Sequence, residues 1–194
     1  MGELRIGSLL EDAAASHPHA VAVTLGPHQR TYADLDRGAN RTAHALRGLG
    51  IEAGERIAWW AGPSLRTVEG FAAAAKLGAP FAALAPGATL EEATAALEML
   101  APRMLVADGP HAEAAAAVVD KLGLDATVVE ADATHGLDDL DARTAAASDR
   151  GVDIPGPAAS DPHVIYLTSG TTGAPKGVVV SHRASWLRAA PGAG

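Results

Sequence analysis

Cysteine is absent from the sequence, which excludes disulfide bonds and thiolate metal sites and fits a reducing compartment such as the cytoplasm. Aromatic residues make up only 4% of the 194 residues, whereas 48% are hydrophobic, so we predict a globular core of small side chains. No stretch is long and apolar enough to span a membrane, and residues 1–16 lack the uninterrupted apolar run of a secretory signal. We therefore expect a cytoplasmic protein with no membrane span.

Positive charge is also scarce, with 15 lysines and arginines against 23 acidic residues and a formal net charge of −8. A protein of this sign must overcome repulsion before it binds a phosphate backbone, and no basic patch offsets the imbalance. We expect no nucleic-acid partner.

The chain alternates between strand-like and helical segments. The strand-like segments lie at 56–60, 80–84, 103–107 and 126–130, and the helical segments at 64–77, 89–100 and 111–122. A helix at 8–16, a strand at 20–25 and a helix from Thr31 precede them. Short strands joined by helical crossovers pair in parallel, so we predict an α/β fold with a doubly wound, mostly parallel sheet flanked by helices.

Local signals mark the ends of several helices. Thr31 with Asp34 and Thr89 with Glu92 have the spacing of capping boxes. Gly78 and Gly123 follow two helical segments, where a left-handed residue commonly ends a helix. Residues 131–162 are rich in Ala, Asp, Gly and Pro without a sustained period, which predicts a polar surface connection.

The stretch "YLTSGTTGAPKGVVVSH", residues 166–182, places a loop between two strand-like segments, with a helix expected to open at Ser181. Glycine lets backbone N–H groups approach phosphate oxygens, hydroxyl groups donate without adding charge, and lysine adds a cation. We predict that the loop binds ATP phosphates or pyrophosphate through Thr168, Ser169, Gly170, Thr171, Thr172, Gly173, Lys176 and Gly177. A Walker A loop is excluded, because Pro175 and Gly177 break its pattern and strand-forming valines follow.

Residues 165–177, "IYLTSGTTGAPKG", resemble the AMP-binding signature of the adenylate-forming superfamily, which includes acyl-CoA synthetases, adenylation domains of nonribosomal peptide synthetases and luciferases. Three further stretches resemble N-terminal blocks of that family in the same order: "TYADLDRGANRTAHALRGLGIEAGERIAWW", "AKLGAPFAALAPGATLEEATAAL" and "DPHVIYLTSG". Ala85 departs from the family, which more often has Asp or Asn there, so weaker turn capping is expected. The resemblance implies that residues 1–194 are the N-terminal part of an acyl-CoA synthetase-like large domain whose C-terminal remainder is absent.

The resemblance also implies a two-step ligase reaction. A carboxylic acid and ATP give an acyl adenylate and pyrophosphate, and a thiol, usually coenzyme A, then displaces AMP to form a thioester, as in fatty acid metabolism. No catalytic residue and no metal ligand is assigned within the chain, because the Mg²⁺ ligands are expected further along. We therefore expect the 194-residue chain to be inactive alone. The alternatives are a nonribosomal peptide synthetase adenylation domain that loads a carrier protein, and a non-catalytic remnant with weak nucleotide binding.

Four other features have less specific interpretations. We interpret "HPH" at 17–19 as a solvated turn rather than a metal site, and the aspartates at 138, 139 and 141 as a solvated surface. Trp59 and Trp60 are expected to pack in the core. His182 could either line the loop site or make a local capping contact beside Ser181.

Overall fold

A seven-stranded sheet forms the centre of the molecule. The computed structural model describes residues 4–131, 137–169 and 175–189, with Ser169 described through its backbone. The strands of this sheet are β3 Ile57–Trp60, β4 Phe81–Ala83, β5 Met104–Ala107, β6 Thr127–Glu130, β7 Asp138–Asp139, β8 Pro162–Ser169 and β9 Pro175–Ser181. They stand in the order β7-β6-β5-β3-β4-β8-β9, and neighbours are parallel except β8 and β9, which are antiparallel. The predicted doubly wound, mostly parallel sheet is confirmed.

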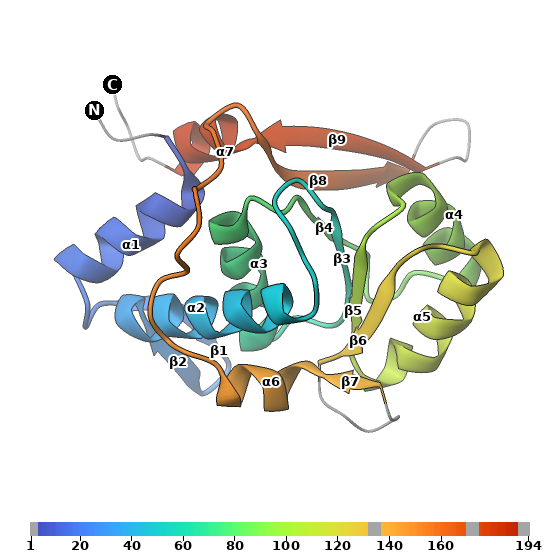
Figure 1. Cartoon of the computed structure of the whole chain (residues 1–194), viewed down its shortest axis with the longest axis horizontal. Helices are drawn as coiled ribbons and strands as arrows, with labels where there is room; N and C mark the ends of the chain where they lie inside the picture. The colour runs from blue at the N-terminus through green and yellow to red at the C-terminus, as the bar shows by residue number, and fades with distance from the viewer. Residues whose placement is uncertain (1–3, 132–136, 170–174, 190–194) are drawn as a thin grey trace.

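Helices cover both faces of this sheet (Figure 1). Their bounds are α1 Ile6–Ser16, α2 Tyr32–Gly48, α3 Leu65–Leu77, α4 Leu90–Leu100, α5 Gly109–Leu122, α6 Leu140–Ala146 and α7 His182–Ala189. One face is covered by α2, α3 and α6, with α1 packed outside α2 and α3, and the other face is covered by α4 and α5. A small antiparallel hairpin, β1 Val21–Leu25 and β2 His28–Thr31, lies beside α2. Within the described ranges, no helix combines the length and apolarity that a membrane crossing needs.

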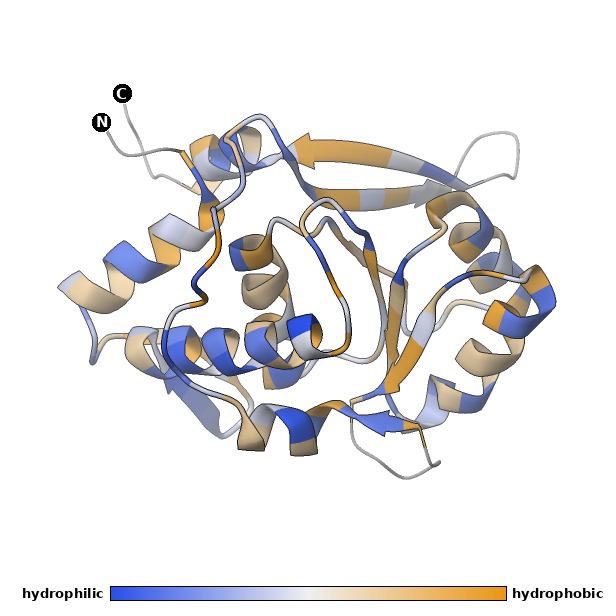
Figure 2. Ribbon diagram, in the orientation of Figure 1, coloured by the Kyte–Doolittle hydropathy of each residue, from blue (hydrophilic) through white to orange (hydrophobic). Residues whose placement is uncertain are grey.

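The core consists of two apolar clusters, one on each face of the sheet. Successive residues of a strand point to opposite faces, so Ile57 and Trp59 belong to the cluster under α2 and α3, whereas Ala58 and Trp60 belong to the cluster under α4 and α5. Both tryptophans are almost fully buried, as predicted. Figure 2 shows the hydrophobic residues concentrated along the central strands and hydrophilic residues on the outer turns of α2.

The predicted helix-end signals are confirmed. Backbone N–H groups of Asp34 and Glu92 donate to the hydroxyls of Thr31 and Thr89 at 3.1 and 3.2 Å, and the acidic side chains accept in return, which completes both capping boxes. Two glycines adopt left-handed conformations after α3 and α5. They are Gly78 with φ of 68° and Gly123 with φ of 60°.

The segment at 131–162 contains more regular structure than the sequence indicates. Within it, β7 adds an edge strand to the sheet. Helix α6 follows directly, and its N-cap is Asp139, whose side chain accepts a hydrogen bond from the Ala142 backbone N–H at 3.0 Å. Leu140 is fully buried in the cluster under α2. Because α6 has only seven residues, its sequence is too short to show a helical period.

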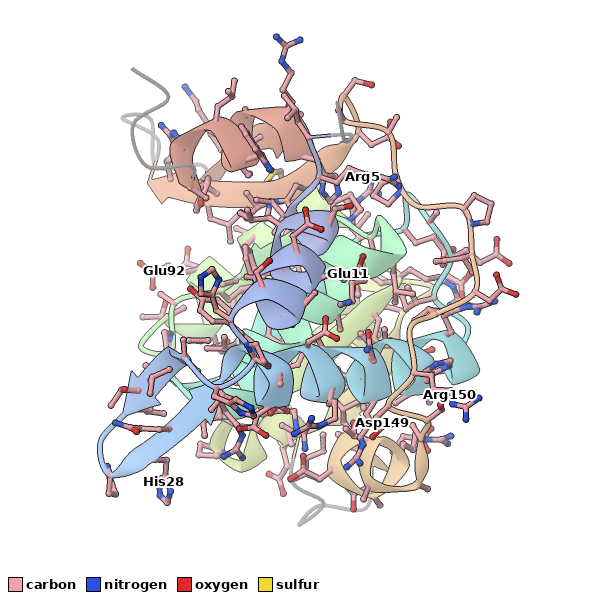
Figure 3. The ribbon with its side chains drawn as sticks, turned by 90° about the vertical axis from the view of Figure 1, so that its left-hand side faces the viewer. Arg5, Glu11, His28, Glu92, Asp149 and Arg150 are labelled. Atoms are coloured by element: carbon pink, nitrogen blue, oxygen red, sulfur yellow. The ribbon has the colours of Figure 1, made fainter. Side chains whose placement is uncertain are left out.

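Beyond α6 the chain runs along the outside of α2. The amide of Asn40 donates to the backbone oxygen of Asp149 at 3.0 Å, and the His44 ring contacts the backbone oxygen of Arg150 at 3.1 Å. Figure 3 shows Asp149 and Arg150 on this side of the molecule, close to α2 and α6. This part of the segment is the irregular surface connection that the composition predicts.

Candidate functional site

The predicted phosphate loop joins the two antiparallel strands β8 and β9 at one end of the sheet. The cross-strand partners nearest the loop are Thr168 with Lys176 and Ser169 with Pro175. Among the predicted ligands, Thr168, Lys176 and Gly177 lie within the described residues, as does the backbone of Ser169. Gly170, Thr171, Thr172 and Gly173 lie outside them. The described residues therefore define the base of the loop.

Thr168 and Lys176 offer two types of donor at this base. Both side chains are exposed, and the Thr168 hydroxyl donates to the backbone oxygen of Lys176 at 3.4 Å. Within the described part of the chain, the Lys176 ammonium forms no ion pair. Because cross-strand partners project from the same face of a hairpin, the hydroxyl and the cation are presented together.

Gly177 has a packing role that the sequence pattern does not show. A Cβ built on Gly177 would lie 3.0 Å from Cγ2 of Ile165 and 3.3 Å from the sulfur of Met99 on α4. Its cross-strand partner is Leu167, which packs against the cluster under α4. The missing side chain therefore allows α4 to approach β9 closely.

A hollow of about 590 Å³ opens beside the base of the loop, between β4, α4 and the end of β8. Its apolar wall comes from Leu84, several alanines of α4 and Leu167, and Thr168 lies at the hairpin side. The parallel strands β4 and β8 are neighbours and both end here, and the carboxyl ends of strands are where α/β sheets commonly bind ligands. The hollow has the size of a small-molecule site.

Acidic side chains mark the α4 side of this hollow. Glu91 and Glu92 both line it, and hydrogen bonds from the backbone and then the hydroxyl of Thr89 hold the pKa of the Glu92 carboxyl below its usual value. An ionised carboxylate repels phosphate oxygens. The hollow therefore suits an uncharged or apolar group better than the phosphates themselves.

Asp108 and His111 connect the three loops that follow β3, β4 and β5 at the carboxyl ends of these strands. The sequence analysis did not identify these two residues. The Asp108 carboxylate accepts from the Gly62 backbone N–H at 2.8 Å and contacts Nδ1 of His111. Nε2 of His111 donates to the backbone oxygen of Pro86 at 2.9 Å, and the His111 ring stacks on Trp60 with centroids 4.8 Å apart. The Asp-x-x-His spacing at the start of α5 was the available signal. The pair holds the turn after β4 that borders the hollow.

His182 does not line the loop site. It begins α7 at the end of β9 that is remote from the loop, about 20 Å away if each strand residue advances about 3.3 Å. Its ring is fully buried, its Nδ1 accepts from the Ile6 backbone N–H at 3.5 Å, and it packs on the His163 ring with centroids 4.8 Å apart. The capping contact is made by the neighbouring Ser181, whose hydroxyl accepts from Ala184. The alternative that placed His182 in the site is wrong, because the strand carries it to the opposite end of the sheet.

The aspartates near α6 act separately rather than as a cation site. Asp138 pairs with Arg143, Asp141 pairs with Arg66, and Asp139 caps α6. Among the described residues, no group of three or more potential ligands is arranged to hold a metal ion.

Comparisons with known proteins agree on one family. A family model described as AMP-binding enzyme matches residues 10–191. The chain is 35% identical over 178 residues to the phosphinothricin tripeptide synthetase PhsC of Streptomyces viridochromogenes, which aligns 90% of this chain with 15% of that protein. It is 28% identical over 191 residues to the 3-oxocholest-4-en-26-oate–CoA ligase of Rhodococcus rhodochrous, which aligns 94% of this chain with 34% of that protein.

A solved structure supports the same conclusion. The fold is similar to that of ATP-bound MatB from Rhodopseudomonas palustris, with a TM-score of 0.79 and 27% identity, and the match covers 93% of this chain and 35% of that one. The chain therefore spans well under two thirds of the length of each of these three proteins.

Proposed function

Since the chain belongs to the family of AMP-binding enzymes, we propose that it supplies the phosphate-binding part of an enzyme that activates a carboxylic acid with ATP. In this reaction the carboxylate attacks the α-phosphate of ATP, an acyl adenylate forms, and pyrophosphate leaves. The observation that carries the proposal is the base of the β8–β9 loop, where the exposed Lys176 is the cross-strand partner of Thr168, whose hydroxyl donates to the Lys176 backbone oxygen.

The residues of this hairpin would act on the leaving group. Negative charge grows on the β-phosphate as the bond to the α-phosphate breaks, and a fixed cation stabilises that charge more than it stabilises the bound substrate. Lys176 is suited to this role because no acidic neighbour among the described residues neutralises it. The acid needs no base, since a carboxylate is already ionised at neutral pH.

Mg²⁺ accompanies ATP in such reactions and shields its charge. The described side chains at the hairpin base, a hydroxyl and an ammonium, are not the carboxylate oxygens that usually hold this ion. We therefore assign no residue of this chain to Mg²⁺, and expect its protein ligands elsewhere in the complete enzyme.

Calorimetric titration of the chain with pyrophosphate and with ATP tests the assignment of Lys176. A hydrogen bond to a charged group contributes about 1.5–3 kcal/mol, so Lys176→Ala is expected to weaken pyrophosphate binding by about tenfold or more. Lys121→Ala removes an exposed lysine from α5 and serves as the matched control, which is expected to leave the affinity unchanged. Equal binding in all three proteins, or no binding in any, would instead support the non-catalytic remnant.

The thiol that receives the acyl group defines two versions of the proposed enzyme. Coenzyme A is the acceptor in our first version. A carrier protein is the second, favoured by the higher identity to the tripeptide synthetase, 35%, than to the CoA ligase, 28%. Mass spectrometry of the complete enzyme incubated with ATP, an acid and either acceptor separates them, because only the true acceptor accumulates as a thioester.

A further inference from the structure

We propose that His111 is a positioning residue whose ring, when it carries two protons, holds the wall of the hollow beside the β8–β9 loop. This is the hollow between β4, α4 and the end of β8, and three of its lining residues, Ala85, Gly87 and Ala88, belong to the turn after β4. The backbone oxygen of Pro86 in the same turn accepts a hydrogen bond from His111. The protonation of the ring therefore acts on the wall of the hollow.

Both ring nitrogens of His111 face groups that only accept hydrogen bonds. Nε2 lies 2.9 Å from the backbone oxygen of Pro86, and Nδ1 contacts the carboxylate of Asp108. A neutral imidazole has one N–H donor, whereas an imidazolium has two. Both contacts are hydrogen bonds only when a second proton is present, and the ring holds it because a carboxylic acid is the stronger acid. The two bonds together form the His111 bridge between α5 and the turn after β4.

The side chain of Asp108 is directed at the ring and not at its own helix. Asp108 occupies the N-cap position of α5, yet its side chain makes no capping hydrogen bond there. One carboxylate oxygen instead accepts from the Gly62 backbone N–H at 2.8 Å, and the other contacts His111. The side chains of His111 and Asp108 are only 17% and 25% exposed, so their attraction is less screened than that of a surface ion pair.

The charged groups around the ring favour an imidazolium, with one exception. Trp60 of β3 stacks on the ring with centroids 4.8 Å apart, and an aromatic face attracts a cation. Glu91 and Glu92 line the same hollow from α4, and Glu130 is buried on the side of β6 that faces α5. The exception is the N-terminus of α5, whose partial positive charge disfavours a cation in the first turn. The carboxylate of Asp108 offsets it.

Loss of the second proton breaks the His111 bridge, whichever nitrogen releases it. If Nδ1 is deprotonated, its lone pair faces the carboxylate of Asp108 and the two repel each other. If Nε2 is deprotonated, the backbone oxygen of Pro86 loses its donor. The bridge is therefore complete at lower pH and is lost as the pH rises, which releases the turn after β4 from α5.

Solvent exchange of the Ala88 backbone amide, measured by NMR on the 194-residue chain at pH 5.5 and pH 7.5, tests the bridge. This amide donates to the Ala85 backbone oxygen within the turn. Its protection, relative to an unstructured chain at the same pH, is expected to be about tenfold higher at pH 5.5, since the turn then gains a hydrogen bond to a charged group. The amide of Leu105, which is buried in β5 at the centre of the sheet, is the internal control and should not change.

Asp108→Asn is the matched control, because it lets a neutral ring keep both contacts. The amide oxygen of the variant accepts from Gly62, its NH₂ group donates to Nδ1 of His111, and Nε2 still donates to Pro86. Ala88 should then be equally protected at both pH values. His111→Gln removes the ring and should lower the protection at pH 5.5 to the wild-type level at pH 7.5, without pH dependence.

Nitrogen NMR of the His111 ring reports its protons directly. At pH 5.5 both ring nitrogens should carry protons in the wild type, whereas Nδ1 should carry none in Asp108→Asn. The proposal is overturned if the wild-type ring is neutral at pH 5.5, or if the protection of Ala88 varies with pH in the same way in the wild type and both variants. None of these measurements involves ATP or Lys176, so the result is separate from that of the proposed pyrophosphate site.

Discussion

Gly70 on α3 shows how a single missing side chain permits the packing of the core. A Cβ at this position would lie 2.4 Å from the ring of Trp59, which is almost completely buried. Gly70→Ala therefore forces the ring or the helix to move and is expected to destabilise the protein by about 1–3 kcal/mol. Urea unfolding at equilibrium measures the change.

Gly48→Ala is the matched control for this substitution. Gly48 is the last residue of α2, and a Cβ there would meet nothing within 4 Å. Alanine is a better helix former, so stability should stay constant or rise by up to about 1 kcal/mol. The packing argument fails if both substitutions change the free energy of unfolding alike.

His163 makes the stability of the protein depend on pH. Burial first, and then the neighbouring His182, lower the pKa of His163 from 6.5 to about 4. Its Nδ1 lies 2.8 Å from the Ser185 hydroxyl, and its ring packs edge-on against Phe71. Asp161 and Arg5 influence His182, whose pKa is also lowered, chiefly by burial.

The sign of the effect follows from these shifts. Because the folded pKa lies below the unfolded value, the fold favours the neutral ring, and its stabilising contribution is complete above about pH 6.5 and is lost as the pH falls toward 4. His163→Gln is expected to reduce the loss of unfolding free energy between pH 7.5 and pH 4.5 by about 2 kcal/mol. Urea titrations at both pH values measure it, with the exposed His28→Gln as control. Identical pH dependence in wild type and both variants would contradict the role of His163.

At the scale of elements, the start of α4 depends on its capping box. The Thr89 hydroxyl accepts from the Glu92 backbone N–H, and the Glu92 carboxylate accepts from the Thr89 backbone N–H at 2.8 Å. Thr89→Ala should therefore lower the free energy of unfolding by about 1 kcal/mol. Thr94 lies about one turn further along the same helix. Because alanine is the better helix former, Thr94→Ala should not lower the free energy of unfolding. Equal losses in the two variants would show that the cap contributes nothing specific.

Most elements of this fold could be predicted because their signals are local. Capping boxes, left-handed glycines and alternating periods depend on residues a few positions apart, and they locate α2, α4 and the central strands correctly. Elements β7 and α6 could not be predicted in this way. They are stabilised by the burial of Leu140 and by pairing with β6, which are tertiary contacts.

In the candidate site, too, the features with local sequence signals could be predicted and those that depend on distant contacts could not. The motif predicts a strand–loop–strand unit with Thr168 and Lys176 near each other, and the described strands have that arrangement. The wall of the hollow comes from α4, about seventy positions earlier in the chain, and the Asp108–His111 pair joins three separate loops. No local pattern specifies contacts of that length.

At the scale of the whole molecule, the chain contains a proposed phosphate-binding hairpin but no residue assigned to Mg²⁺ or adenine. We therefore expect no turnover by the 194-residue chain in a pyrophosphate-release assay with ATP, Mg²⁺ and a panel of short-chain, aromatic and fatty acids. A full-length enzyme that contains this sequence is the positive control. Acid-dependent release of pyrophosphate by the chain itself would overturn this expectation.

The contact between α1 and α7 joins segments that are far apart along the chain. Ile6 and His182 meet across 176 positions, and β8 pairs with β4 through Val164 and Phe81. A ribosome releases the N-terminal elements first, so the edge of β4 that pairs with β8 stays unpaired until residues 162–169 have emerged. Contacts between such distant segments slow folding and leave apolar surface exposed meanwhile. A newly made chain therefore exposes an unpaired, aggregation-prone edge of β4 until β8 pairs with it.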